Sequence, residues 1–168
     1  MTLDSGLVRR IILTVCMAIY SAGFAEKIAL FDIGTGKVKM QIVEEEEGSI
    51  TSLACLREST NIDVSYFLEH KKIGASGDKL LQTLAELKEM ALSYGCTRYE
   101  AVATELFRQA EDGEEFARKI TKTLQIQTRV ITSKEEAVLA FWTVVREKGL
   151  DPQKVVVLDM GSGSFQFA

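Results

Sequence analysis

The sequence has 168 residues, of which 46% are hydrophobic and 26% are charged, a composition typical of a globular chain long enough to bury one core. Its formal net charge is -4, and lysine and arginine form no stripe along the chain. This distribution argues against sequence-independent binding to nucleic acid, because the neutralisation of phosphates requires clustered cations. The single proline and the absence of a Ser/Gly-rich tract indicate no linker.

The first 25 residues differ from the rest. Arg9 and Arg10 precede an uncharged run over residues 11–25, which ends in small residues at Gly23 and Ala25. This run is shorter than the roughly 18–20 apolar residues that span a bilayer. The order of basic residues, apolar run and small residues is typical of a cleavable signal peptide, so we expect 1–25 to be one and the protein to be periplasmic or secreted. The alternatives are an uncleaved anchor, or a start codon assigned too early in a cytoplasmic protein.

Three strands are predicted after residue 26. Residues 27–33 read as a buried strand, and residues 37–46 alternate between apolar and polar side chains as a hairpin partner. The glycines of the intervening Gly34-Thr35-Gly36 segment favour a tight turn. Residues 49–56 supply a third strand and complete a meander, and residues 57–75 are expected to form a loop with a short helix.

Strands and helices alternate from residue 76 onward. The pattern predicts helices over 76–95, 111–124 and 133–149, and strands over 98–106, 126–131 and 154–161. A meander followed by this alternation favours an α/β fold with a mixed sheet flanked by helices. Cys55 and Cys96 have no metal-binding or disulfide-framework spacing, so we expect two separate thiols.

Two predicted strands end in an aspartate and run into a glycine-rich loop. Asp32 begins "DIGTGK" near the start of the chain, and Asp159 begins "DMGSGS" near its end. Glycines let the backbone approach a ligand, and successive N–H groups can then bind an anion. An aspartate repels phosphate but can bind Mg²⁺. The two loops therefore either clamp a phosphate chain or are ordinary hairpin turns.

Two further residues have competing interpretations. Ser133 and Glu136 have the spacing of a capping box, which would use Glu136 to satisfy the start of the helix over 133–149. Alternatively, Glu135 or Glu136 points into a cleft and activates water as a general base. Arg108 can bind a phosphate or pair with a neighbouring acid.

Taken together, four segments resemble, in this order, the exopolyphosphatase/guanosine pentaphosphate phosphohydrolase (Ppx/GppA) family. Its patterns are D-[IL]-G-[ST]-N-[ST], G-T-x-x-x-R-x-A, I-S-G-x-E-E-A-x-L and D-[IL]-G-G-G-S-x-E. The matching segments are "DIGTGK" at 32–37, "ATELFRQA" at 103–110, "ITSKEEAVL" at 131–139 and "DMGSGSFQ" at 159–166. The resemblance implies the actin–Hsp70–sugar-kinase (ribonuclease H-like) fold, with a first domain built on a mixed five-stranded sheet.

The resemblance also implies roles for individual residues. The second glutamate of the E-E-A segment is the family's catalytic base, which corresponds to Glu136. Asp32 and Asp159 would bind Mg²⁺, and the substrate would be polyphosphate or guanosine pentaphosphate. The phosphate-binding positions would be Gly34, Thr35, Lys37, Arg108, Gly161, Gly163 and Ser164.

Several positions depart from the family patterns. Gly36 replaces an asparagine and Lys37 a hydroxyl residue in the first loop, whereas Ser162 replaces a glycine in the second. Gln166 replaces the acidic residue that closes the second pattern, which removes a negative charge and a proton acceptor. Two functions are therefore weighed: a working phosphoanhydride hydrolase, and a catalytically degenerate module that binds or scaffolds. A sugar or acetate kinase of the same fold fits the E-E-A segment less well.

The resemblance also divides the chain. Residues 26–153 would form the first phosphatase domain, and residues 154–168 would begin a second domain. In the family, the cleft lies between two domains of similar size. We therefore expect the rest of that cleft to come from a longer gene product or from a partner chain, including a dimer partner.

Overall fold

A computed structural model describes residues 25–160 and 165–167, so the predicted signal peptide lies outside the described residues apart from Ala25. The centre is a five-stranded sheet in the order β3-β2-β1-β4-β5. β1 (Glu26–Ile33), β2 (Lys37–Glu46) and β3 (Ser49–Ser59) form an antiparallel meander, whereas β4 (Arg98–Ala103) and β5 (Gln127–Val130) extend it in parallel. The mixed five-stranded sheet expected from the sequence is confirmed.

The alternation along β2 separates the two faces of this sheet. Val38, Met40 and Ile42 are fully buried, whereas Lys39 and Gln41 between them are exposed. Because successive side chains of a strand point to opposite faces, one face becomes the core and the other carries the charged residues. Asp32 of β1 lies opposite Lys39 and therefore belongs to the charged face.

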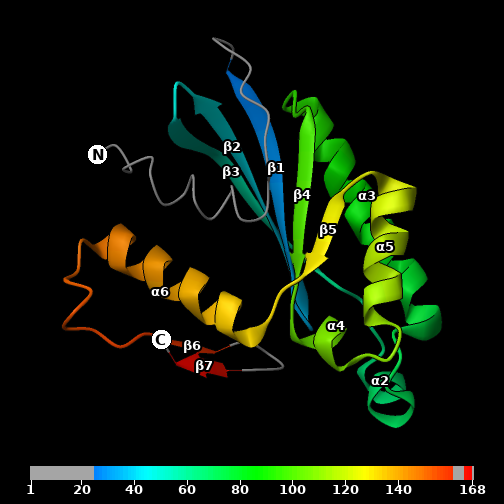
Figure 1. Cartoon of the computed structure of the whole chain (residues 1–168). Helices are drawn as coiled ribbons and strands as arrows, with labels where there is room; N and C mark the ends of the chain where they lie inside the picture. The colour runs from blue at the N-terminus through cyan, green and yellow to red at the C-terminus, as the bar shows by residue number, and fades with distance from the viewer. Residues whose placement is uncertain (1–24, 161–164, 168) are drawn as a thin grey trace.

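Two helices cover the apolar face of the sheet, as Figure 1 shows: α3 (Gly77–Ser93) and α5 (Gly113–Leu124). Their inward stripes and the buried strand residues form one hydrophobic cluster. Its largest helical members are Leu80, Leu84, Leu87, Phe116 and Ile120. α6 (Ser133–Lys148) lies on the other side of the sheet (Figure 1), where the charged face is.

The predicted strand over 98–106 is wrong at its C-terminal end, because β4 stops at Ala103 and a short helix, α4 (Glu105–Gln109), follows. Thr104 causes the break, since its N–H donates to the carbonyl oxygen of Ile33 at 3.1 Å and ties the chain to the end of β1. Leu106 and Phe107 are then buried as consecutive helix residues. This helix, rather than a strand, positions Arg108.

The segment expected to be a loop with a short helix contains more regular structure. β3 continues to Ser59, and α2 (Val64–His70) and a 3-10 turn (Gly74–Ser76) follow. Asp63 caps α2 by accepting a hydrogen bond from the N–H of Tyr66. Farther along the chain, Asp112 accepts hydrogen bonds from the N–H groups of Ile73 and Gly74, which joins this region to the start of α5.

The last strand, predicted over residues 154–161, is shorter in the structure. β6 (Leu158–Met160) pairs with β7 (Phe165–Phe167) in a separate two-stranded antiparallel sheet. Within the described ranges, no helix has both the length and the apolar character required to cross a bilayer. Cys55 is exposed, Cys96 is buried and both are free, as the sequence predicts.

The start of α6 corrects the predicted capping box by one position. Thr132, not Ser133, is the N-cap, and its Oγ1 accepts a hydrogen bond from the N–H of Glu135 at 3.2 Å. The Glu135 carboxylate accepts in turn from the N–H of Thr132 at 2.8 Å. The reciprocal bonds therefore belong to Thr132 and Glu135, and Glu136 plays no part in the cap.

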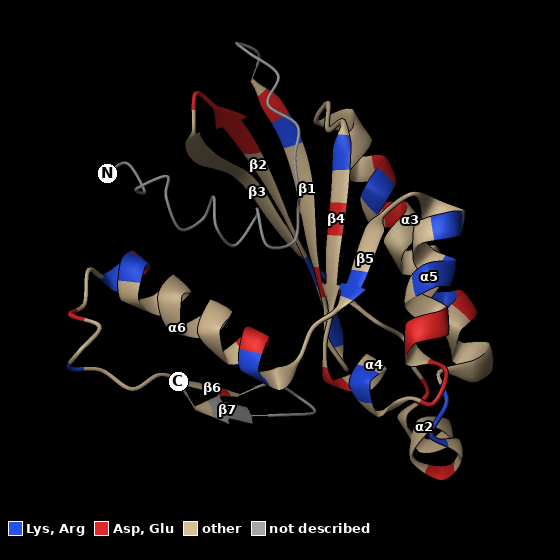
Figure 2. Cartoon of the chain, in the orientation of Figure 1, with Lys and Arg blue, Asp and Glu red and all other residues tan. Residues whose placement is uncertain are grey.

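The charges of α6 lie at its two ends, and the helix is uncharged from Ala137 to Val145 (Figure 2). A helix that is apolar on every side normally lies inside a protein. In α6, however, Val145 is the one fully buried residue, and Val138 is 46% exposed. The described part of the chain therefore covers only part of the apolar surface of this helix.

Replacing Gly113 by alanine should destabilise the fold, because a Cβ there would lie 1.9 Å from the carbonyl oxygen of Phe107. Backbone must move to relieve such an overlap, so we expect Gly113→Ala to lower the free energy of unfolding by about 3 kcal/mol. Urea denaturation followed by circular dichroism measures the change. Gly149→Ala is the control, since open space surrounds that site and only its φ of 62° opposes a side chain, at a cost of about 1 kcal/mol. Equal losses would contradict the packing argument.

The cap of α6 should make folding sensitive to acid. The Arg129 guanidinium, 2.6 Å from Glu135, and the N–H of Thr132 lower the pKa of Glu135 from 4.5 to about 2. A carboxyl with a lower pKa in the folded state stabilises the fold above its unfolded pKa, and this contribution is lost as the pH falls from about 4.5 to 2. Glu135→Gln should therefore flatten the pH dependence of the unfolding free energy in that window. The effect is reduced by solvent screening, because the side chain is 36% exposed.

Chemical denaturation at a series of pH values tests this expectation. Glu147→Gln is the matched control, because it removes the same charge from the exposed opposite end of α6, away from the cap. An identical pH dependence for Glu135→Gln and the unaltered chain would show that the cap contributes no acid-sensitive stability.

Candidate functional site

The first glycine-rich loop is a closed turn held by a buried threonine. The N–H of Gly34 donates to the carbonyl oxygen of Lys37 at 3.0 Å. Thr60, only 2% exposed, donates from Oγ1 to the carbonyl of Thr35 at 2.8 Å and from its N–H to the carbonyl of Gly36 at 3.2 Å. These two bonds from Thr60 tie the loop to the chain that follows β3. The N–H of Gly34 is used to close the turn.

Asp32 lies beside this loop on the charged face of the sheet. Its carboxylate accepts from Nζ of Lys39 at 3.1 Å, and the two side chains are 43% and 54% exposed. Both residues also line a cavity of about 460 Å³ between the sheet and α6, together with Arg57 of β3 and Leu139 of α6. Such a volume lies in the range of pockets for small ligands. The loop, Asp32 and the cavity are thus adjacent.

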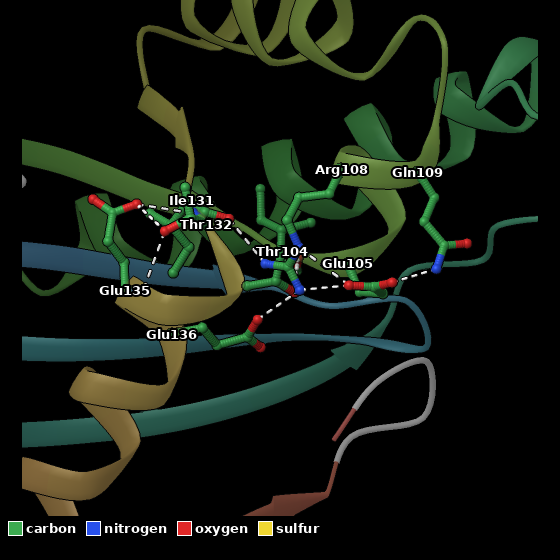
Figure 3. Close-up of polar contacts among 9 residues, drawn as sticks. Thr104, Glu105, Arg108, Gln109, Ile131, Thr132, Glu135 and Glu136 are labelled. Atoms are coloured by element: carbon green, nitrogen blue, oxygen red, sulfur yellow. Dashed lines mark hydrogen bonds and ion pairs between the residues drawn. The ribbon is translucent and has the colours of Figure 1, made fainter. Parts of the chain in front are cut away.

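Arg108 of α4 joins three elements, as Figure 3 shows. Its Nε and Nη2 donate to one carboxylate oxygen of Glu105 at 3.1 and 2.6 Å, and Nη1 donates to the carbonyl oxygen of Ile131 at 2.9 Å. Nη2 also lies 2.8 Å from the carboxylate of Glu136 at the start of α6. Four of the five N–H donors of the guanidinium therefore have protein partners.

Glu136 occupies a different environment from Glu135, although the two are consecutive. Its side chain is 18% exposed and points toward Arg108 (Figure 3), whereas Glu135 pairs with Arg129 and Thr132. Burial raises the pKa of Glu136, the Arg108 guanidinium opposes this, and the carboxylates of Asp32 and Asp159 add to the rise. A buried carboxyl with a raised pKa is a typical general base or acid.

The structure brings four of the predicted site residues into one neighbourhood: Asp32, Arg108, Glu136 and Asp159. Arg108 contacts Glu136 directly, and both aspartates are close enough for their charges to affect it. Asp159 is exposed on β6, and its backbone pairs with that of Gln166 on β7.

The remaining predicted positions belong to the two loops. Lys37 is exposed at the first residue of β2, directly after the turn that contains Thr35. Gly161, Gly163 and Ser164 lie outside the described residues.

The donor set fits Mg²⁺ if the substrate completes the coordination. No group of three or more metal-ligating side chains occurs among residues 25–160 and 165–167. Mg²⁺, however, usually keeps several waters and binds through one or two carboxylates and the phosphates of its substrate. Asp32 and Asp159 offer two such carboxylates, both at least partly exposed to solvent. An ion bound to Asp32 would have to compete with Lys39.

Two residues of the site could not be identified from the sequence. Thr60 follows β3 in a segment without periodicity, and nothing in the sequence indicates its bonds to a loop 25 residues earlier. Glu105 is misassigned to a strand, which separates it from Arg108, whereas in α4 the two lie three residues apart on one helix. An E-x-x-R spacing signals this pair only after the helix is recognised.

The chain was compared with known proteins. A sequence model of the Ppx/GppA phosphatase family matches residues 27–168. Exopolyphosphatase 1 of Mycobacterium tuberculosis is 25% identical over 141 residues, which cover 83% of this chain and 41% of that protein. The Aquifex aeolicus PPX-GPPA enzyme has 25% identity and a TM-score of 0.72, over 86% of this chain and 48% of its own. An exopolyphosphatase from Cytophaga hutchinsonii has 21% identity and a TM-score of 0.71, over 84% of this chain and 46% of its own.

The chain thus spans less than half the length of each of these relatives. The shared fold confirms the actin–Hsp70–sugar-kinase class that the four segments predict. Because the family match extends from residue 27 to residue 168, the chain belongs to the Ppx/GppA phosphatase family and corresponds to the N-terminal domain of its members.

Proposed function

We propose that the protein hydrolyses terminal phosphoryl groups of inorganic polyphosphate or guanosine pentaphosphate. Phosphatase-like function follows from the family, and the exopolyphosphatases among its relatives favour a phosphoanhydride substrate. The observation that carries the proposal is the environment of Glu136. Its side chain is shielded from water, its pKa is raised, and it lies close to Arg108 and two aspartates. No other described carboxylate combines these properties.

Glu136 is the proposed catalytic base. It would accept a proton from the water that attacks the terminal phosphorus, while the phosphoanhydride bond breaks and the rest of the chain leaves as a phosphate. A raised pKa makes a carboxylate a stronger base once it is ionised. In the structure one oxygen of Glu136 lies 2.8 Å from Nη2 of Arg108, and that oxygen becomes fully available to water only when the contact with Arg108 is released. A phosphate that takes over the Nη2 donor of Arg108 would cause this release.

The phosphates would be bound by backbone and cationic groups around the first loop. The rigid turn presents Thr35 next to exposed Lys37, and Arg108 approaches from α4. Gly161, Gly163 and Ser164 would complete the cradle from the second loop. Asp32 and Asp159 would hold Mg²⁺, which would supply positive charge for the phosphoryl oxygens.

The rest of the cleft is proposed to come from a second domain that residues 154–168 begin, in the same chain or in a partner, including a dimer partner. The partial coverage of every compared relative supports this proposal. So does the apolar surface of α6, which the described residues leave partly exposed. We also propose that a signal peptide at 1–25 directs the protein to a periplasmic or secreted location.

A binding module without turnover is the second candidate. Gln166 favours it, since a neutral amide replaces the acidic residue of the family pattern at the position whose backbone pairs with Asp159. The loss of one negative charge there weakens Mg²⁺ binding and removes a proton acceptor. Such a module would bind polyphosphate and release no phosphate.

Glu136→Gln separates the two candidates. If Glu136 is the base, phosphate release from polyphosphate or guanosine pentaphosphate in the presence of Mg²⁺ should fall by at least about 100-fold, because the amide cannot accept the proton. Release by the unaltered chain should also increase with pH through the pKa of Glu136, which is higher than that of an ordinary glutamate. Phosphate release measured across the pH range checks both expectations.

Glu147→Gln is the matched control, because it removes the same charge from the exposed end of the same helix and should keep full activity. Equal release by Glu136→Gln and the unaltered chain would exclude Glu136 as the base. Tight binding of polyphosphate without release by the folded, unaltered chain would support the binding module.

A further inference from the structure

Glu105 contacts Arg108, which is proposed to bind a phosphate, and it stands at a position for which the family pattern specifies no residue type. In the segment "ATELFRQA", the threonine, the arginine and the last alanine match the pattern, and Glu105 occupies the first variable place. Its carboxylate nonetheless makes the shortest contact of Arg108, 2.6 Å to Nη2. This chain therefore carries a carboxylate partner for Arg108 that the pattern does not require.

The geometry makes Glu105 the firm partner of Arg108. One Glu105 oxygen accepts from both Nε and Nη2, while the other accepts from Nε2 of Gln109 one turn along the same helix. The carboxylate is thus held on both sides by its own helix (Figure 3), and its side chain is only 19% exposed. Both oxygens of the Glu105 carboxylate therefore bond to side chains of α4 itself.

Glu136 is by contrast the exchangeable partner. It approaches Nη2 from another helix, with Oε2 at 2.8 Å, and is not held by α4 itself. Burial raises the pKa of Glu136, whereas for Glu105 the hydrogen bonds from Arg108 and Gln109 outweigh burial and lower the pKa. Ionised Glu105 is therefore stabilised at its site and ionised Glu136 is not.

The charges of this cluster oppose an incoming phosphate. One guanidinium and two carboxylates give a net charge of -1 when all are ionised, in a region where each side chain is less than 20% exposed. A phosphate that takes an Nη2 donor of Arg108 must therefore displace a carboxylate, and its attraction is reduced by the carboxylate that stays.

We propose that Glu105 is a positioning and specificity-determining residue, which orients Arg108 and lowers its affinity for phosphate, so that a phosphate binds at Nη2 by exchange with Glu136. This inference rests on the proposed function only in its assignment of Arg108 as a phosphate ligand. Glu105 itself touches neither substrate nor the reacting atoms. Its effect is to favour substrates that bring additional contacts over isolated phosphate.

Glu105→Gln tests the inference, because the amide can still accept from Arg108 but lacks the charge. We expect it to bind inorganic tripolyphosphate about fivefold more tightly than the unaltered chain at low ionic strength, and the gain should shrink as salt is added. Isothermal titration calorimetry in EDTA measures binding without turnover. A merely structural role predicts weaker or unchanged binding, since damage to α4 would misplace Arg108.

Two further variants make the result specific. In the double variant Glu105→Gln with Arg108→Gln, compared with Arg108→Gln alone, the gain should disappear, because it acts through Arg108. Glu111→Gln removes a charge from a nearby exposed acid that lies 3.9 Å from Lys72, and it should leave the affinity within experimental error of the unaltered chain. Circular dichroism of every variant verifies folding.

The outcomes separate this inference from the proposed reaction. Tighter binding by Glu105→Gln, with no phosphate release by any variant in Mg²⁺, would reject the reaction and support the inference. Release by the unaltered chain, without tighter binding by Glu105→Gln, would overturn the inference alone. Absence of tripolyphosphate binding by both the unaltered chain and Glu105→Gln would also overturn it.

Discussion

The guanidinium of Arg108 is the contact on which the arrangement of the site depends. It connects α4, through Glu105, with the chain between β5 and α6, through the Ile131 carbonyl, and with α6 itself, through Glu136. One side chain thus joins three segments that are separate in the sequence. Removing one partner of such a shielded pair strands a charge, which costs several times more than an exposed ion pair contributes, about 3–5 against 0–1 kcal/mol. The contact between Arg108 and Glu136 therefore helps to hold the start of α6 against α4.

Arg108 reaches this position because the end of β1 organises the chain around it. The Ile33 carbonyl accepts from Thr104, which terminates β4 and turns the chain into α4, and Thr60 holds the loop that follows β1. Both threonines are at least 95% buried, so their bonds are sheltered from competing water. A single strand end thereby positions the Asp32 loop on one side and the arginine on the other. The site is a consequence of how the parallel strand β4 is joined to β1.

Much of this organisation was predictable from the sequence, and the exceptions share a physical cause. The period-2 pattern of 37–46 and the apolar stripe from Leu80 to Ala91 identify elements whose stability comes from burial along one face, and both are confirmed. The strand predicted over 98–106 fails at Thr104, because a tertiary hydrogen bond to Ile33 overrides local preference. The capping box shifts by one residue because Thr132 and Ser133 are equivalent in sequence, and only the backbone direction at the end of β5 selects between them. Pairing between side chains of different elements, such as Glu136 with Arg108, produces no pattern in the local sequence from which it could be predicted.

The consecutive glutamates Glu135 and Glu136 show how one turn of helix can give identical side chains different chemistry. Glu135 points back to the cap, where Arg129 and the Thr132 N–H stabilise its charge and lower its pKa to about 2. Glu136 is rotated about 100° farther around the helix, faces the sheet side and loses water, so its pKa rises. A carboxylate held ionised by two donors is a poor proton acceptor, whereas a desolvated one is a good acceptor as soon as its cation leaves. The helix cap and the proposed base are thus divided between neighbours, and the corrected cap position leaves Glu136 available for the chemistry that the family resemblance assigns to it.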